Sequence, residues 1–204
     1  MDRLEQYRTI FADLTLAAHR AYRRGIQTGS GGNMSARIPG TEHMIVKNSG
    51  GSFADCTEQG SGWIAMKYDG TLLSGEAGKP TREWLLHATL LRALPETGAV
   101  VHFHSPYTIA WAAQHSEIPQ TTWHSGLKFG CVIPVVDIPA AVVPQEYMQT
   151  ILDLFQENPS LPAFVLRGHG LVAVGKNAVS AEHTAELVEE TAKITVLEKL
   201  ISRA

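Results

Sequence analysis

The stretch Val100–Ser105 carries two histidines, His102 and His104, at the end of an apolar run. Such a run is typical of a buried β-strand. Because side chains at positions i and i+2 of a strand point to the same face, the two imidazoles are expected to lie side by side. Imidazole is a good ligand for zinc and other late first-row metals, so the pair forms half of a candidate metal site.

A third histidine, His169, lies between two glycines in the sequence RGHG. Apolar segments at 163–166 and 171–174 are expected to be strands on either side of it, which places His169 in a tight turn. Glycines leave little crowding around such a side chain, and this suits a metal ligand. The chain contains nine histidines, so this pattern alone leaves the alternative of a structural histidine open.

A carboxylate that could complete the site is Glu83. The sequence KPTREW predicts the start of a helix, with Thr81 as its cap and Glu83 in the first turn. The helix is expected to end at Pro95. Glu83 and His87 share one face with Leu90, Leu91 and Leu94, so Glu83 is predicted to point towards the interior. His87 itself is interpreted as a hydrogen-bonded core histidine.

Two small, polar segments could hold an anion. Residues 28–35 read TGSGGNMS and are expected to form a loop, and residues 48–52 read NSGGS. Backbone N–H groups in glycine-rich loops can approach a ligand closely, and phosphate is the anion most often held in this way. The alternative is that both segments are plain turns.

Length and composition favour one globular domain spanning residues 1–204. The net charge is −3, and no cluster of basic residues predicts binding to nucleic acid. The only cysteines, Cys56 and Cys131, lack metal-binding spacing and suggest free thiols in a reducing compartment. No signal peptide and no membrane-spanning run is recognisable, so a cytoplasmic protein without a membrane partner is expected.

The remaining pattern alternates helices and strands. Apolar residues recur at helical spacing from Leu4 to a stop at Gly25, and further helices are expected at 106–114, 144–156 and 181–200. Strands are expected at 44–47, 63–66 and 131–136. The last helix carries apolar residues on more than one face, which indicates packing against another subunit.

The ordered motifs GGNMS, KPTRE, VVHFHS and RGHG resemble those of the class II aldolase/adducin-head family, which includes fuculose-phosphate aldolases. The resemblance runs from Thr28 to the C-terminal helix. It implies an α/β fold, a three-layer α/β/α domain with a mostly antiparallel central sheet. It also implies a cyclic homotetramer with active sites between neighbouring subunits.

The resemblance also implies roles for particular residues. His102, His104 and His169 match the zinc ligands, at a site that Co²⁺ or Mn²⁺ could also serve. Glu83 matches the carboxylate that acts as acid and base, and it could be a fourth ligand until substrate displaces it. The matching substrate-phosphate positions are Ser30, Gly32, Asn33, Ser49, Gly50 and Thr81.

Two departures leave the reaction open. Arg82 replaces a small residue and could bind phosphate or a substrate carboxylate, and Trp123 stands where aldolases place a proton-donating tyrosine from a neighbouring subunit. The leading interpretation is a zinc-dependent lyase, an aldolase that cleaves a small phosphorylated ketose through a metal-stabilised enediolate. The alternatives are a dehydratase acting on methylthioribulose 1-phosphate, a decarboxylase acting on a 3-oxo sugar-acid phosphate, and a non-catalytic interaction module like the adducin head.

Overall fold

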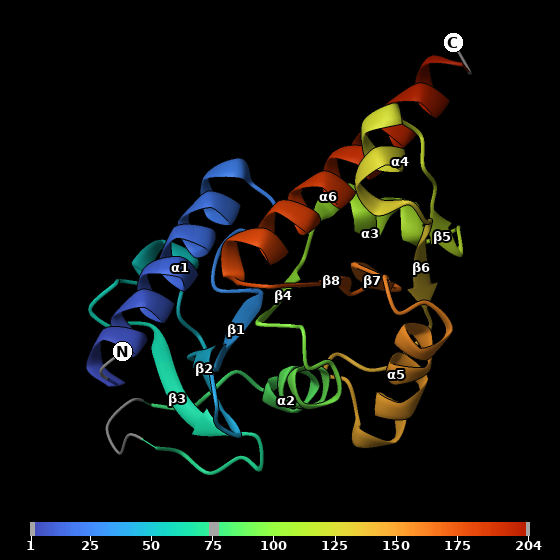
Figure 1. Cartoon of the computed structure of the whole chain (residues 1–204). Helices are drawn as coiled ribbons and strands as arrows, with labels where there is room; N and C mark the ends of the chain where they lie inside the picture. The colour runs from blue at the N-terminus through green and yellow to red at the C-terminus, as the bar shows by residue number, and fades with distance from the viewer. Residues whose placement is uncertain (1–2, 74–77, 203–204) are drawn as a thin grey trace.

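An eight-stranded sheet forms the centre of the protein in the computed structural model, which describes residues 3–73 and 78–202 (Figure 1). The strands lie in the order β3-β2-β1-β4-β8-β7-β6-β5. Their bounds are β1 Asn33–Ile38, β2 His43–Lys47, β3 Trp63–Lys67, β4 Ala99–Phe103, β5 Glu117–Ile118, β6 Ile133–Val136, β7 Ala163–Leu166 and β8 Gly170–Gly175.

The sheet is mixed but mostly antiparallel. Only β6 and β7 pair in parallel, with Val135 opposite Val165, and every other named pair of strands is antiparallel. At the centre, β1 pairs with β4 so that Asn33 lies opposite His102. The predicted α/β class and mostly antiparallel sheet are therefore confirmed, with this one parallel pair as the exception.

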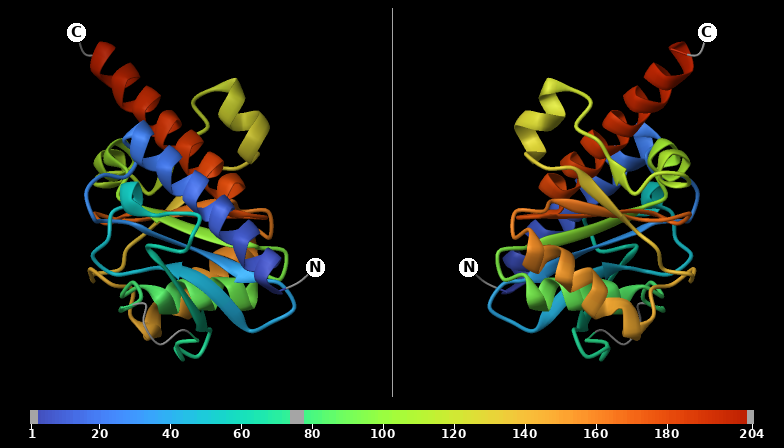
Figure 2. Two further views of the ribbon diagram at one scale, coloured as in Figure 1. Left: turned by 90° about the vertical axis from the view of Figure 1, so that its left-hand side faces the viewer. Right: turned by 90° about the vertical axis from the view of Figure 1, so that its right-hand side faces the viewer.

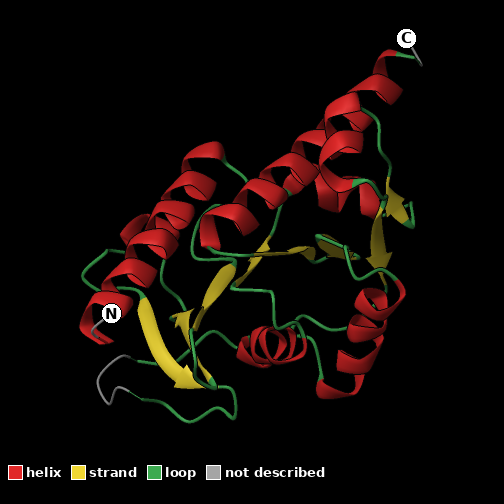
Figure 3. Cartoon of the chain, in the orientation of Figure 1, coloured by secondary structure: helices red, strands yellow, loops and turns green. Residues whose placement is uncertain are grey.

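Helices cover both faces of the sheet, as the side views in Figure 2 show, and this confirms the predicted three layers. Helices α1, α3 and α6 pack on one face, with α4 beside α6, whereas α2 and α5 lie on the other face (Figure 3). The bounds are α1 Arg3–Arg24, α2 Trp84–Ala93, α3 Pro106–Ala112, α4 Trp123–Phe129, α5 Met148–Glu157 and α6 Ala178–Ile201. Short 3-10 turns, η1 Phe53–Asp55 and η2 Gln145–Tyr147, precede β3 and α5.

Two apolar cores lie on the two faces of the sheet. The first joins α1 and α6 to the sheet through residues such as Leu14 and Val188, and the second joins α2 and α5 through Leu86 and Ile151. Successive strand residues alternate between these cores, so Val101 faces the first core and Val100 faces the second. His102 follows the same alternation and therefore faces α2.

Most elements agree with the sequence-based expectations, and three details differ. Residues 28–35 are not all loop, because β1 begins at Asn33. The segment around Trp123, which gave no regular pattern, forms the short helix α4, with Thr122 as its cap. Within the described ranges no helix is long and apolar enough to cross a membrane.

The third difference concerns the start of α2. Thr81 is not its cap, because the helix begins at Trp84 and Glu83 holds the N-cap position. Thr81 instead accepts a hydrogen bond from the backbone N–H of Glu83 at 3.4 Å. A turn at residues 82–83 separates Thr81 from the helix, and this turn carries the Glu83 side chain into the interior.

Candidate metal centre and active site

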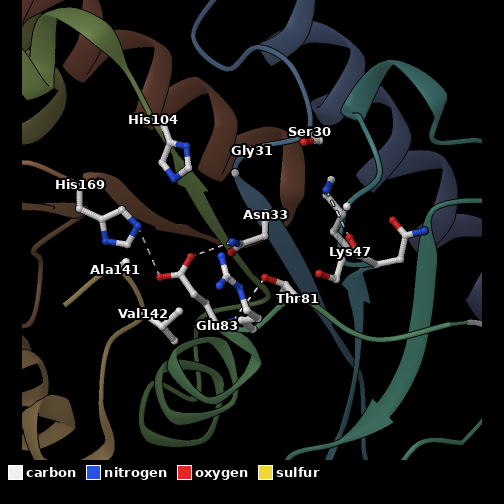
Figure 4. A pocket seen from close by; sticks show the side chains of 15 residues that line it. Ser30, Gly31, Asn33, Lys47, Thr81, Glu83, His104, Ala141, Val142 and His169 are labelled. Atoms are coloured by element: carbon white, nitrogen blue, oxygen red, sulfur yellow. Dashed lines mark hydrogen bonds and ion pairs between the residues drawn. The ribbon is translucent and has the colours of Figure 1, made fainter.

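The three predicted histidines converge from two places far apart in the sequence. His102 and His104 lie in and just after β4, and His169 lies in the turn between β7 and β8. Figure 4 shows His104 and His169. Their ring centroids are 4.7 to 5.4 Å apart. One nitrogen from each ring lies within 4.8 Å of the others, which makes this group a candidate metal site.

His102 is held rigidly beneath this group. Its side chain is fully buried, and its Nδ1 lies 3.1 Å from the backbone carbonyl oxygen of Leu171. Because a carbonyl can only accept, Nδ1 carries the proton and Nε2 is left with a lone pair. This Nε2 faces the Glu83 carboxylate, 3.4 Å from Oε2. A backbone carbonyl that fixes the far nitrogen in this way is typical of metal-binding histidines.

The two glycines beside His169 are required for different structural reasons. Gly168 has a φ of +67°, a conformation that favours glycine over any other residue. A Cβ atom at Gly170 would collide with the carbonyl oxygen of Phe103 and lie 3.0 Å from Cε1 of His102. The close approach of β8 to β4 therefore requires glycine, and it is this approach that brings His169 against His102.

His104 is positioned by the first glycine-rich segment. Its backbone N–H donates to Oε1 of the buried Gln27 at 2.7 Å. A Cβ atom at Gly31 would lie 2.8 Å from Nδ1 of His104, so the imidazole packs directly on the glycine backbone. Sequence reasoning missed Gln27, because no local pattern connects residue 27 with residue 104.

Electrostatics keeps the histidines in the form that binds metals. Burial lowers the pKa of His102 well below its ordinary value, and His169 and His104 lower it further. Burial is also the main cause that lowers the pKa of His104, followed by His169. Both rings are therefore neutral near pH 7, and a neutral ring nitrogen can coordinate a metal.

Glu83 points inwards at the histidines, as predicted, although it does so from the N-cap before α2 and not from a face of the helix. It is 6% exposed, and its Oε2 accepts a hydrogen bond from Nδ2 of Asn33 at 2.9 Å. Its Oε1 lies 3.8 Å from Nε2 of His169 and has no hydrogen-bond partner. Nε2 of His102 is also buried without a hydrogen bond. Two buried polar atoms without hydrogen bonds are costly, and a divalent cation held by Glu83 and the histidines would satisfy both.

A cavity of about 340 Å³ opens beside these residues and contains the predicted anion-binding segments. Every residue predicted for the site except the buried His102 lines it. The lining residues are Ser30, Gly31, Gly32, Asn33, Lys47, Asn48, Ser49, Gly50, Thr81, Arg82, Glu83, His104, Ala141, Val142 and His169. Figure 4 shows His104 and His169 on one side of the cavity, Ser30 and Lys47 on the other, and Glu83 and Asn33 between them.

Backbone hydrogen bonds join two of the lining segments. The N–H of Ser49 donates to the carbonyl of Lys79 at 2.8 Å, and the N–H of Thr81 donates to the carbonyl of Lys47 at 3.0 Å. These bonds hold Ser49, Gly50 and Thr81 along one wall. Their role in binding phosphate stays a prediction, as it does for Ser30, Gly32 and Asn33.

Lys47 is the lining residue that sequence reasoning missed. It is 1% exposed, and burial lowers its pKa. Its ammonium group lies 3.3 Å from the carbonyl oxygen of Asn48 and 5.4 Å from the centroid of the Phe53 ring. Among the described residues no carboxylate pairs with it, so a buried cation borders the cavity without a counter-ion. The sequence feature that could have indicated its burial is the two-residue spacing, which places Lys47 on the same strand face as the core residue Ile45.

The residue at the position of the aldolases' proton-donating tyrosine lies elsewhere. Trp123 is 98% exposed on α4 and does not line the cavity. Arg82 does line the cavity, with an exposed side chain.

Comparisons with known proteins agree with the fold. The family model of the Class II Aldolase and Adducin N-terminal domain matches residues 12–196, and the chain belongs to this family. One similar structure is YgbL of Escherichia coli, described as a candidate aldolase/epimerase/decarboxylase, with 28% identity, a TM-score of 0.78, and coverage of 94% of this chain and 90% of that one.

Two aldolase structures share the fold. An L-fuculose 1-phosphate aldolase has 23% identity and a TM-score of 0.81, with 95% and 87% of the two chains covered. The L-fuculose-1-phosphate aldolase of Thermus thermophilus has 21% identity and a TM-score of 0.79, with 96% and 97% covered. These two likenesses show the fold, and membership of the family rests on the family model.

Proposed function

We propose that this protein is a zinc-dependent lyase that cleaves a small phosphorylated ketose. The observation that carries this proposal is the position of Glu83 between two different halves of one cavity. His104 and His169, with His102 buried behind them, form one half, and loops rich in backbone N–H groups, with the buried Lys47, form the other. A substrate with adjacent carbonyl and hydroxyl oxygens at one end and a phosphate at the other matches this arrangement.

His102, His104 and His169 are the residues that would hold the metal ion, and Glu83 would share it in the absence of substrate. The bound ion would supply Lewis-acid polarisation of the substrate oxygens. In retro-aldol cleavage the hydroxyl beside the breaking C–C bond gives up its proton and becomes the carbonyl of the released aldehyde, and the electron pair of that bond stays on the carbon beside the other carbonyl. Glu83 would take up a proton, from this hydroxyl or from water, and deliver it to that carbon. Asn33, which donates to Oε2, holds the carboxylate in place, while Oε1 faces Nε2 of His169 and has no hydrogen bond.

The second half of the cavity supports the proposal that the substrate carries a phosphate group. Ser49, Gly50 and Thr81 lie on one wall, and Ser30 and Gly32 lie on the loop before β1. Hydroxyl and backbone N–H donors in such loops suit phosphate oxygens. The ammonium group of Lys47 would complete the site by neutralising charge, because a buried cation without a carboxylate partner is stabilised by a bound anion.

Decarboxylation of a 3-oxo sugar-acid phosphate is the second candidate reaction. Its support is Arg82, whose exposed side chain lines the cavity in addition to Lys47, so that the cavity could accommodate two anionic groups. A guanidinium group can bind a carboxylate in a bidentate manner. The description of the 28%-identical YgbL also includes decarboxylase. Release of CO₂ distinguishes this reaction from aldol cleavage and from dehydration of a methylthioribulose-type phosphate.

A homotetramer with active sites between subunits is part of the proposal. Apolar side chains are exposed on α4 and at the end of α6, where Trp123 is 98%, Leu127 83% and Ile201 75% exposed. Apolar groups exposed together in this way often mark protein contacts. Light scattering on the purified protein measures the assembly directly.

The Glu83→Gln variant tests the role of the carboxylate. Glutamine keeps the size of the side chain and can accept the hydrogen bond from Asn33, but it cannot carry the proton. We expect turnover of phosphorylated ketoses to fall by ~10²–10⁴-fold while metal remains bound, since general acid–base groups contribute in this range. Turnover at the wild-type rate would remove Glu83 from the mechanism.

Metal analysis of the wild type and of His169→Ala tests the metal site. We expect a single divalent ion per chain in protein purified without chelator, and a large loss in the variant, because one of three protein ligands is missing. His183→Ala is a matched control, because His183 is exposed on α6, away from the candidate site. Wild-type protein without metal, or a variant with unchanged metal, would favour the non-catalytic interaction module.

A further inference from the structure

A buried polar ladder connects β1 to α2 behind the candidate active site. On the face of β1 that looks towards α2, Asn33 contacts Glu83 and His87, and Ser35 contacts His87. One rung further along, Arg37 donates to the carbonyl oxygens of Leu91 and Leu94 at the other end of the helix. Asn33, Ser35 and His87 are all buried, and His87 is fully so.

The hydrogen bonds of this ladder have a single consistent direction. The Glu83 carboxylate, when ionised, can only accept, so the Asn33 amide nitrogen faces it and the amide oxygen faces His87. His87 therefore donates through Nε2–H to Oδ1 of Asn33. In the neutral ring Nδ1 is then an acceptor, and the hydroxyl of Ser35 donates to it at 2.8 Å.

The chain thus runs from Ser35 through His87 and Asn33 to Oε2 of Glu83, with every donor pointing towards the carboxylate. Hydrogen bonds arranged head to tail in a buried site strengthen one another. Without His87, nothing in the described structure would hold the amide oxygen of Asn33, and the amide could rotate. Its NH₂ group would then no longer be fixed against Glu83.

We propose that His87 is a positioning residue for catalysis, which acts through Asn33 to hold Oε2 of Glu83 and leave Oε1 facing His169 without a hydrogen bond. This inference rests on the proposed role of Glu83 in proton transfer. It assigns Asn33 to the carboxylate, whereas the resemblance to the family implied that Asn33 binds phosphate. His87 touches neither the cavity nor the histidine group, so it affects the reaction only through the orientation of Glu83.

The test compares His87→Leu, which removes the chain, with His87→Gln, whose amide can both donate to Asn33 and accept from Ser35. We expect kcat to fall by roughly 10²-fold in H87L, because a displacement of about 1 Å at a catalytic group has an effect of this size. The KM should change little, and H87Q should recover part of kcat. Metal content should remain that of the wild type in both variants.

Arg37→Met is the matched control. It weakens the same interface between β1 and α2 but touches neither Asn33 nor Glu83, so it should lower the melting temperature with kcat unchanged. If H87L and R37M lower the melting temperature equally and neither changes kcat, His87 is only structural and the proposal is wrong. If H87L does not fold, the same decision rests on H87Q, Ser35→Ala and R37M, since S35A also removes the first donor of the chain.

A second measurement does not depend on turnover. Nitrogen NMR of the metal-free wild type, with His87 assigned by comparison with H87Q, reports which ring nitrogen carries the proton. A proton on Nε2 is expected, and a proton on Nδ1 would overturn the proposal whatever the enzyme's substrate proves to be. If no phosphorylated sugar is turned over but Nε2 is protonated, the proposed function fails while the hydrogen-bond chain stands.

Discussion

Replacing Lys47 by methionine should affect stability and binding in opposite directions. The ammonium group is 1% exposed, and among the described residues it has a carbonyl but no carboxylate near it. Methionine has a similar length and no charge. We expect the free energy of unfolding of K47M to rise by about 1–3 kcal/mol, because the penalty for burying an unpaired cation is removed. In a chain of this length, the melting temperature should rise by about 2–4 °C for each kcal/mol.

The same substitution should weaken binding of the anionic end of the substrate. A hydrogen bond to a charged group contributes about 1.5–3 kcal/mol, which corresponds to roughly a 10- to 150-fold loss in kcat/KM for a phosphorylated substrate. The loss should be much smaller for the sugar without phosphate. Residues that bind a ligand often lower the stability of the ligand-free protein. Opposite effects of K47M on stability and on binding would show that Lys47 is such a residue.

Thermal unfolding with and without inorganic phosphate is the assay. A ligand that binds only the folded state raises the melting temperature by mass action, so phosphate should stabilise the wild type more than K47M. Lys67→Met at the end of β3 is the control, because Lys67 does not line the cavity. If phosphate stabilises K47M as much as the wild type, or if K47M is less stable than the wild type without phosphate, the reasoning about Lys47 is refuted.

Two further predictions concern the scaffold of the site. Burial lowers the pKa of His87 to about 3, so below pH 6.5 the unfolded chain binds a proton there that the folded chain does not. The metal-free protein should therefore lose about 1.4 kcal/mol of stability from this residue between pH 7.5 and 5.5, measured by urea unfolding, and this part of the pH dependence should be absent in His87→Leu. Gly170→Ala should destabilise the protein and lower its metal content, because its Cβ would meet the Phe103 carbonyl; unchanged metal binding would show that β8 can shift without moving His169.

Periodicity predicted the part of the site that depends on single elements. The two-residue repeat of β4 and the residue after it placed His102 and His104 on one side, and the helical pattern correctly indicated that Glu83 points inwards, although a turn before α2 is what directs it. These features depend on local geometry, which the order of residues largely determines. The convergence of His169 with the other histidines followed from the resemblance to a family, because no local pattern specifies the contact between β8 and β4.

The errors arose where distant contacts override local preference. Threonine is a residue type favoured at helix N-caps, but the backbone hydrogen bond between Thr81 and Lys47 holds Thr81 in an extended segment before the helix. Lysine at the end of a strand is usually exposed, so Lys47 gave only a weak signal. The glycines of residues 28–32 concealed the start of β1, although Asn33 and the next residues alternate as a strand does.

The ladder between β1 and α2 shows how such a contact could be recognised from the sequence. Two residues of a strand span about 6.6–6.8 Å, and four residues of a helix span about 6 Å, so polar residues with these spacings can remain opposite one another over several rungs. Asn33, Ser35 and Arg37 have the strand spacing, while Glu83, His87 and Leu91 have the helix spacing. Because the first two rungs, Asn33 with Glu83 and Ser35 with His87, act at the start of the helix, the sequence of β1 helps to determine where the Glu83 carboxylate lies. A polar residue at every second position of a buried strand therefore indicates a partner helix as well as a position in the sheet.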